Sequence, residues 1–227
     1  VLSGLSSTAF AQLGTGQWRM HVAASQAIDV AYGDGLAMAA LKTGVIEYDE
    51  AAGETKIYND QNGLSDIIVS CISYDTGTKS FFIGYNNGNI DQLYSDGSIV
   101  NIPAVKLAAI TGNKRINSFT SKNGRVFAAT GFAIIVLDPI KHEVKDTYNP
   151  FSVPKNYQSV LFVNDSIYAL HNDGAMETGT IKFNQGVMSS WGSAWTLDVH
   201  GISAHGSTPH RRAGAAAPDR RRSRSSG

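Results

Sequence analysis

The 227-residue sequence has a single cysteine, no excess of charge of either sign and no long apolar run. Cys71 has no partner for an internal disulfide and no Cys-x-x-Cys spacing, which excludes a disulfide scaffold and the common structural zinc sites. The apolar stretches are shorter than the ~20 residues of a membrane-spanning helix. With 42% hydrophobic and 17% charged residues, the chain has the composition of a folded body of one or two domains.

Catalytic and cofactor motifs are also missing. The chain contains no Gly-x-Ser-x-Gly, no His-Glu-x-x-His, no phosphate-binding Gly-rich loop and no Cys/His set with metal-ligand spacing. We therefore predict that the protein is not an enzyme, with no catalytic residues, no cofactor and no metal site. Which residues bind a ligand is left unknown by the sequence.

The net charge of zero hides a division between body and tail. Residues 1–202 hold 13 basic and 18 acidic side chains, whereas residues 203–227 hold six arginines and one aspartate. The tail has no Phe, Tyr, Ile, Asn or Trp, and its residues shift to types with GC-rich codons, as a sequence junction would produce. We expect residues 201–227 to be a basic disordered or artefactual tail. A nucleic-acid-binding arm is the third and least favoured reading, because the tail has no aromatic side chain for base stacking. We therefore predict no nucleic-acid partner.

The first eleven residues are small and apolar and end in Ala9-Phe10-Ala11, the small-x-small pattern of a signal-peptidase site. This predicts residues 1–11 as a truncated signal peptide and export of the mature chain from Gln12. An ordinary apolar strand is the alternative, because no initiating methionine or basic segment precedes the pattern.

The body repeats itself. Four apolar residues, Ile28, Ile72, Ile116 and Val160, are spaced by 44 residues, and each opens a series of short alternating or apolar runs. Asn-Gly or Asp-Gly occurs six times between Asp34 and Gly174, which favours tight antiparallel hairpins. A four-stranded antiparallel unit at this period is typical of a β-propeller blade, whereas a β-sandwich shows no such register between units.

We therefore predict an all-β fold, an incomplete β-propeller over residues 12–200. It would hold about three and a half to four four-stranded antiparallel blades of a larger ring. A further strand at Gln17–Val22 has no hairpin partner and is expected to complete a last blade. The residues 26–183 should form consecutive blades, with the four residues of the 44-residue series in equivalent inner strands.

Several side chains have both a functional and a structural interpretation. Carboxylates recur near strand ends and could hold a cation or a sugar, although capping of turns explains them more simply; they are Asp49, Asp75, Asp91 and Asp138. His142 and His171 lie near predicted turns and are expected to face solvent. Trp191 and Trp195 could stack on a sugar but more often such residues pack a core. Cys71 reads as a small buried hydrophobe, and Asn164-Asp165-Ser166, a glycosylation triplet, fits a plain turn.

The run Asn62-Gly63-Leu64-Ser65, with Asn87-Gly88 further on, resembles the two-component regulator propeller repeat. Tyr85 stands where that repeat usually has Thr. Residues 16–150 are similar to the N-terminal propeller of the PorZ family, surface proteins of the type IX secretion system in Bacteroidetes.

The resemblance implies a non-catalytic propeller at the outer membrane or cell surface. Its implied partners are the secretion attachment complex, which hands cargo to a sortase, and anionic lipopolysaccharide. The alternative that the same repeat allows is the periplasmic sensor propeller of a hybrid two-component histidine kinase. A propeller glycosidase or lyase is a third, minor alternative.

Overall fold

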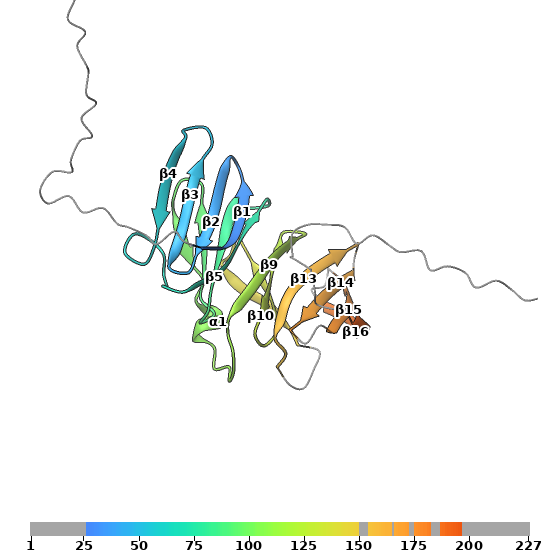
Figure 1. The fold of residues 1–227 in the computed structure, drawn as a ribbon. Helices are drawn as coiled ribbons and strands as arrows, with labels where there is room; N and C mark the ends of the chain where they lie inside the picture. The colour runs from blue at the N-terminus through green and yellow to red at the C-terminus, as the bar shows by residue number, and fades with distance from the viewer. Residues whose placement is uncertain (1–25, 150–153, 165, 173–174, 183–186, 197–227) are drawn as a thin grey trace, which may run out of the picture.

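The computed structural model describes residues 26–149, 154–164, 166–172, 175–182 and 187–196, with side chains as far as Asn172. The expected signal peptide, the strand at Gln17–Val22 and the basic tail lie outside these residues. Within them, the chain is almost entirely antiparallel β-structure (Figure 1). No helix in this part of the protein is long and apolar enough to cross a membrane.

The strands form four sheets of four, which we call blades 1 to 4, and in each blade the strands follow sequence order. Blade 1 consists of β1 (Ala27–Gly33), β2 (Leu36–Leu41), β3 (Gly44–Asp49) and β4 (Glu54–Tyr58). Blade 2 consists of β5 (Val69–Asp75), β6 (Ser80–Tyr85), β7 (Ile90–Tyr94) and β8 (Ile99–Asn101). Blade 3 consists of β9 (Ile116–Lys122), β10 (Arg125–Thr130), β11 (Ile134–Asp138) and β12 (Glu143–Tyr148). Blade 4 consists of β13 (Tyr157–Val163), β14 (Ser166–His171), β15 (Ala175–Lys182) and β16 (Val187–Thr196). A single helical turn, α1 (Ala104–Leu107), joins blades 2 and 3.

The predicted propeller blades are confirmed, and the four residues of the 44-residue series all lie in first strands, β1, β5, β9 and β13. Their positions within these strands differ, however. The strand pairings make Ala27, Val69, Ile116 and Tyr157 equivalent, at successive intervals of 42, 47 and 41 residues. The longest interval contains α1. The connections between blades differ in length, so the constant spacing of 44 residues correctly identifies the first strand of each blade but not the structurally equivalent residues within those strands.

Each first strand carries a β-bulge after its first residue, at Ile28, Ser70, Asn117 and Gln158. The bulged side chain reaches the next blade in two cases. Ser70 Oγ donates to the carbonyl of Ile116 (2.7 Å), and Asn117 Nδ2 donates to that of Tyr157 (2.6 Å). Because a bulge re-aims one side chain away from the ladder, it converts a strand residue into a link between neighbouring blades.

The core lies between the blades. One cluster joins Met38 and Val45 of blade 1 to Phe81 of blade 2, and two further clusters fill the blade 2–3 and blade 3–4 interfaces. All six residues of β6 are buried, because blades cover both faces of this strand. In β1, by contrast, exposed and partly buried positions dominate. The difference follows from position in the row, because among the residues that the structure describes blade 1 has a neighbouring blade on one side.

Tight turns explain most of the Asn-Gly and Asp-Gly pairs. Asp34-Gly35 and Asn123-Gly124 have positive φ at both residues and close two-residue hairpins. Asn62-Gly63 is different, since it lies in the connection from blade 1 to blade 2 and closes no hairpin. Asp173-Gly174 lies outside the described residues.

Candidate recognition site

The connection between β4 and β5 builds one end of blade 2, and its conformation follows from the motif Asn-Gly-Leu-Ser. The carbonyl of Asn59 accepts the N–H groups of Asn62 (3.1 Å) and Leu64 (2.9 Å), and Asn62 Nδ2 donates back to the carbonyl of Ile57 (2.6 Å). Gly63 has φ +139°, a conformation that a side chain would strain. This loop inserts Leu64, 5% exposed, into the core between blades 1 and 2.

A buried carboxylate ties the end of the loop to blade 2. Asp91 in β7 is fully buried. Its Oδ2 accepts the Ser65 N–H (2.8 Å) and the Tyr85 hydroxyl (2.6 Å), and its Oδ1 accepts Asn101 Nδ2 (2.8 Å). Burial, and after it the charge of Asp91, raises the pKa of Tyr85 well above its ordinary value. Tyr85 is therefore a hydrogen-bond donor at any physiological pH.

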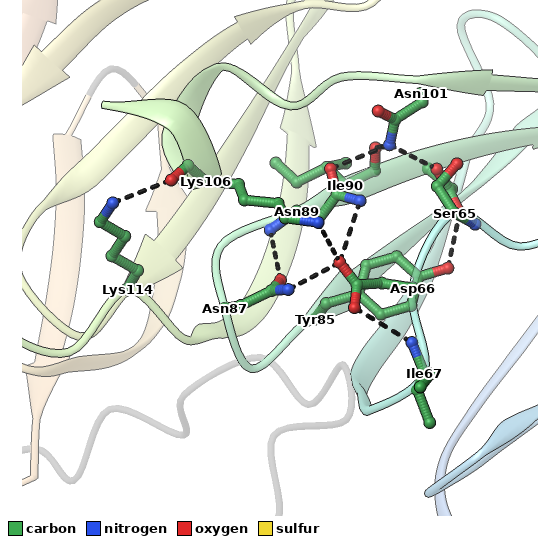
Figure 2. Close-up of polar contacts among 11 residues, drawn as sticks. Ser65, Asp66, Ile67, Tyr85, Asn87, Asn89, Ile90, Asn101, Lys106 and Lys114 are labelled. Atoms are coloured by element: carbon green, nitrogen blue, oxygen red, sulfur yellow. Dashed lines mark hydrogen bonds and ion pairs between the residues drawn. The ribbon is translucent and has the colours of Figure 1, made fainter. Parts of the chain in front are cut away.

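A second carboxylate, that of Asp66, lies nearer the surface and connects its own β4–β5 segment to the β6–β7 turn and to α1. Asp66 Oδ2 accepts Asn87 Nδ2 (2.6 Å) from the β6–β7 turn and Lys106 Nζ (2.7 Å) from α1 (Figure 2). Asn89 Nδ2 lies 3.4 Å from the same oxygen. Partial burial raises the pKa of Asp66, but the hydrogen bonds from Asn87 and Lys106 outweigh it and the pKa falls below its ordinary value. The carboxylate of Asp66 is thus ionised near neutral pH and hydrogen-bonded to Asn87 and Lys106.

The helical turn α1 is held on this end by its own contacts. Val105 is 3% exposed and belongs to the core between blades 2 and 3. Lys114 Nζ donates to the carbonyls of Lys106 (2.9 Å) and Ala108 (2.6 Å), where the helix ends. A cation at a helix C-terminus satisfies carbonyls that have no partner within the helix. Residues 104–107 are therefore fixed on this end of the blades by the burial of Val105 and the hydrogen bonds of Lys114.

This end of the blades combines positive charge with exposed apolar side chains. It is formed by the β2–β3 and β6–β7 turns and by the β4–β5 and β8–β9 connections, and we call it the loop face. Its basic residues are Lys42, Lys106, Lys114 and Arg115, and its exposed apolar residues are Ile67 (52%), Ile68 (41%) and Leu107 (75%). Chemically, such a surface suits an anionic ligand or a protein partner.

Three of the four carboxylates singled out from the sequence lie at the opposite end and cap turns, as the simpler interpretation expected. Asp49 Oδ1 accepts the N–H groups of residues 51 and 52, and Asp75 Oδ2 accepts the N–H and hydroxyl of Thr78. Asp138 accepts two N–H groups of its turn and forms an ion pair with Arg125. The four carboxylates do not converge on a cation or sugar site. No group of metal-ligating side chains occurs within the described residues.

For Asp91 the turn-capping interpretation is wrong. Its side chain reaches a loop 26 residues earlier in the chain, because the blade 1–2 connection folds over the start of β7. Alternation in β7 could not show this, since both of its faces are buried.

The two histidines are not solvent-facing as expected. His171 is 1% exposed, and its ring meets that of Tyr157 edge-on at 4.8 Å, because these residues pair across β13 and β14. His142 lies in the β11–β12 turn with φ +58° and is partly buried, with Nε2 3.2 Å from the Tyr94 hydroxyl. Their predicted location at or near turns is confirmed, since His142 lies within a turn and His171 is the last residue of β14, directly before a turn.

The remaining candidates are structural or undescribed. Cys71 is 2% exposed, and burial, then the nearby charge of Asp29, raises its pKa to about 12, so the thiol is inert. Asn164 lies in the β13–β14 turn with φ +53°, consistent with a plain turn. The side chains of Trp191 and Trp195 lie outside the described residues.

Sequence reasoning missed the residues that hold the loop face together: Asp66, Asn89, Asn101 and Lys106. Asp66 was visible as the acidic residue directly after Asn-Gly-Leu-Ser. The asparagines carried no signal, because Asn is equally common in plain turns.

Comparison with known proteins gives one family. The model of the PorZ N-terminal β-propeller domain, of the type IX secretion system, matches residues 39–191. No curated protein matches the sequence.

Solved structures agree with this family. PorZ of Porphyromonas gingivalis, described as an essential bacterial surface component of the type IX secretion system, has 27% identity and a TM-score of 0.63 over 74% of this chain. The match covers 22% of PorZ, so the chain spans about a fifth of that protein's length.

Two further solved structures are less similar. The extracellular domain of a putative one-component system of B. thetaiotaomicron (TM-score 0.57, 15% identity) is matched over 67% of this chain and 20% of its own. A chain of the mitotic checkpoint complex (0.53, 12%) is matched over 72% of this chain and 50% of its own. The last two share the fold alone. With the family model matching more than half of its length, the chain belongs to the PorZ N-terminal β-propeller family.

Proposed function

We propose that this chain is part of a non-catalytic recognition propeller that acts at the cell surface in type IX secretion. The support is membership of the PorZ family together with the surface location stated for the P. gingivalis protein. Export, proposed from the signal-like N-terminus, agrees with this role. The proposed partners are proteins of the attachment complex and anionic lipopolysaccharide, bound in the intact parent protein.

The loop face is the observation that carries the proposal. Loops at one end of a rigid β-scaffold are where binding residues concentrate, and here they are fixed by the Asp66 and Asp91 hydrogen bonds. Lys42 is exposed on this face, and Leu107, 75% exposed, directly follows Lys106, whose ammonium pairs with Asp66 (2.7 Å). Positive charge favours phosphorylated or carboxylated sugars, and apolar side chains add contact area with a protein or an acyl chain.

Disruption of the intact parent gene tests the biological role. We expect secretion cargo to remain unprocessed, because the attachment complex would lack its recognition component. Normal cargo processing together with loss of a transcriptional response to a glycan would reject the secretion role and favour a sensor propeller.

Charge reversal tests the ligand face. In the intact parent, Lys42→Glu with Arg115→Glu should weaken binding to purified anionic lipopolysaccharide about tenfold, and less at high salt, because screening already weakens such contacts. Lys141→Glu with Lys145→Glu, the same change at the opposite end of the blades, is the matched control. Equal losses in both double variants, with unchanged melting temperatures, would reject the loop face as the binding site.

A further inference from the structure

The sequence contains three Asn-Gly pairs, Asn62-Gly63, Asn87-Gly88 and Asn123-Gly124, and the structure places them in different surroundings. In such a pair the backbone nitrogen of glycine can attack the asparagine side chain, because glycine has no side chain in the way. Asparagine is for this reason a thermolabile residue. The attack needs an amide that can turn and an N–H that is not already hydrogen-bonded. Local hydrogen bonds therefore decide which of the three pairs can react.

The first pair is held by the loop between β4 and β5. Both ends of the Asn62 amide are bonded, since Oδ1 accepts the Asn59 N–H (2.6 Å) and Nδ2 donates to the carbonyl of Ile57 (2.6 Å). The next residue but one, Leu64, is buried in the core between blades 1 and 2. Turning the Asn62 amide toward the Gly63 nitrogen would break both hydrogen bonds.

The second pair is held at the amide and at the attacking nitrogen. Asn87 Oδ1 accepts the Asn89 N–H (3.0 Å), and Asn87 Nδ2 donates to Asp66 (2.6 Å). The Gly88 N–H donates to the carbonyl of Tyr85 (3.2 Å), and Gly88 is buried. Water and the attacking group are thus both kept from this amide.

The third pair has none of these restraints. Asn123 and Gly124 form the two-residue turn between β9 and β10 (Figure 1), with φ +49° and +68°, and both are exposed. A Cβ at Gly124 would meet nothing within 4 Å. Among the residues that the structure describes, no hydrogen bond is formed by the Asn123 amide or by the Gly124 N–H. Amide, nucleophile and water therefore have access to one another.

Two basic residues flank this turn. Lys122 and Arg125 are the cross-strand pair that closes the hairpin. Attack by the Gly124 nitrogen places negative charge on the oxygen of the Asn123 side chain, and nearby positive charge stabilises such an oxyanion. The carboxylate that the reaction leaves at position 123 also gains cationic neighbours.

We propose that Asn123 is a site of spontaneous deamidation in the folded protein. The Gly124 nitrogen bonds to Cγ of Asn123 and gives up its proton, and the side-chain nitrogen leaves as ammonia, so that a five-membered succinimide forms. Water then opens this ring. Cleavage of the new Cγ–N bond gives aspartate, whereas cleavage of the original peptide C–N bond gives isoaspartate, in which the main chain runs through the side chain. The net change is the uptake of one water and the loss of one ammonia.

The equivalent turn of blade 1 indicates what each product does to the hairpin. Asp34-Gly35 joins β1 and β2 with φ +54° and +79°, so an aspartate already occupies the same place in the same conformation. Isoaspartate adds one carbon to the main chain of a two-residue turn and disturbs the pairing of Lys122 with Arg125. Deamidation should therefore yield a native-like form with one more negative charge and a form with a weakened β9–β10 hairpin.

The test is incubation of the full chain at mildly alkaline pH, followed by chymotryptic digestion and mass spectrometry of the peptides that contain the three pairs. We expect Asn123 to react at least about tenfold faster than Asn62 or Asn87, because each of these must first break two hydrogen bonds. In denaturant the three rates should become similar, since the dipeptide is the same.

Two variants serve as controls. Asn123→Asp should show no mass change at this peptide and should keep the melting temperature of the unmodified chain, whereas chains that carry isoaspartate should melt lower. Asp66→Ala removes the acceptor of Asn87 Nδ2 and should raise the rate at Asn87 but not at Asn62.

Two results would overturn the proposal. If Asn62 or Asn87 reacts as fast as Asn123 in the folded chain, hydrogen bonding does not select the site. If Asn123 reacts in denaturant but not in the folded chain, the hairpin holds its amide away from the Gly124 nitrogen.

Discussion

At the scale of single residues, the buried carboxylate of Asp91 attaches the end of the β4–β5 loop to blade 2. The loop forms no strand there, so this carboxylate supplies the hydrogen bonds that a neighbouring strand would otherwise supply. Three donors from three segments converge on it: the Ser65 N–H, the Tyr85 hydroxyl and the Asn101 amide. An asparagine offers one acceptor oxygen and places an NH₂ group against the remaining donors. A buried donor without an acceptor costs about 1–3 kcal/mol, and more where a charged group was involved.

Asp91→Asn should therefore lower the free energy of unfolding by about 2–4 kcal/mol. Chemical denaturation followed by fluorescence measures it. Asp96→Asn is the matched control, because Asp96 caps an exposed turn through one oxygen and should change stability by less than about 0.5 kcal/mol. Equal effects of the two changes would mean that Asp91 is not the anchor of the loop.

Gly84 is required by close packing between blades. A Cβ at this position would lie 2.7 Å from Cys71 Sγ and 2.8 Å from Ile116 Cγ2. Gly84→Ala should cost about 1–3 kcal/mol by overpacking, measured as a lower midpoint of thermal or chemical unfolding. Gly77→Ala serves as control, since a Cβ there meets nothing closer than 3.4 Å. An unchanged midpoint for Gly84→Ala would show that β9 can move away from β6 at little cost.

At the scale of elements, α1 and its connection are held by Asp66 and Lys114. The pKa of Asp66 is lowered in the folded protein: partial burial opposes this, but hydrogen bonds from Asn87 and Lys106 prevail. Its contribution to stability is therefore present above the unfolded pKa of about 3.9 and is lost as pH falls through the lower folded pKa.

Asp66→Asn should accordingly reduce stability near pH 7, and the difference from the unmodified protein should shrink below about pH 4. Melting temperatures recorded from neutral to acidic pH measure this. Asp60→Asn, at an exposed position of the same connection, controls for removal of one acidic residue. A difference for Asp66→Asn that stays constant down to acidic pH would contradict the role given to the ion pair.

The elements that follow from local pattern could be predicted, and those that depend on neighbouring blades could not. Alternation and Asp-Gly turns located the hairpin of β1 and β2 because both signals lie within a few residues of each other. The bulge at Asn117 and the burial of His171 depend on contacts with another strand or blade. The turn α1 is too short to show helical periodicity, and it is fixed by Lys114 and Val105 instead.

At the scale of the whole molecule, the sequence repeats allowed the fold to be predicted, whereas the residues of the loop face could not be predicted. Each blade repeats the same apolar pattern, so four weak signals reinforced one another. The loop face repeats nothing: Asp66, Asn89 and Lys106 each occur once, in connections of unequal length. They converge because the connections that precede and follow blade 2 both meet its β6–β7 turn, an arrangement that no single segment encodes.

The basic tail gives a prediction about the whole chain. Residues 203–227 have no Phe, Tyr, Ile or Trp, so they have little apolar surface to offset the entropy of ordering a chain. Deleting them should leave the melting temperature within about 2 °C of the full chain, since 1 kcal/mol corresponds to roughly 2–4 °C at this size. The deletion also removes six arginines and one aspartate, leaving an acidic body.

Any binding of the full chain to DNA or heparin should therefore disappear in the truncated chain, and in the full chain it should weaken steeply with added salt, because released counterions supply its free energy. Scanning calorimetry and a salt series of DNA-binding titrations measure the two effects. A drop in melting temperature beyond about 4 °C, more than 1 kcal/mol at this size, would mean that the tail belongs to the fold. Binding to DNA that survives truncation would instead place a nucleic-acid surface on the blades, where Lys42 and Arg115 of the loop face would be the first residues to change.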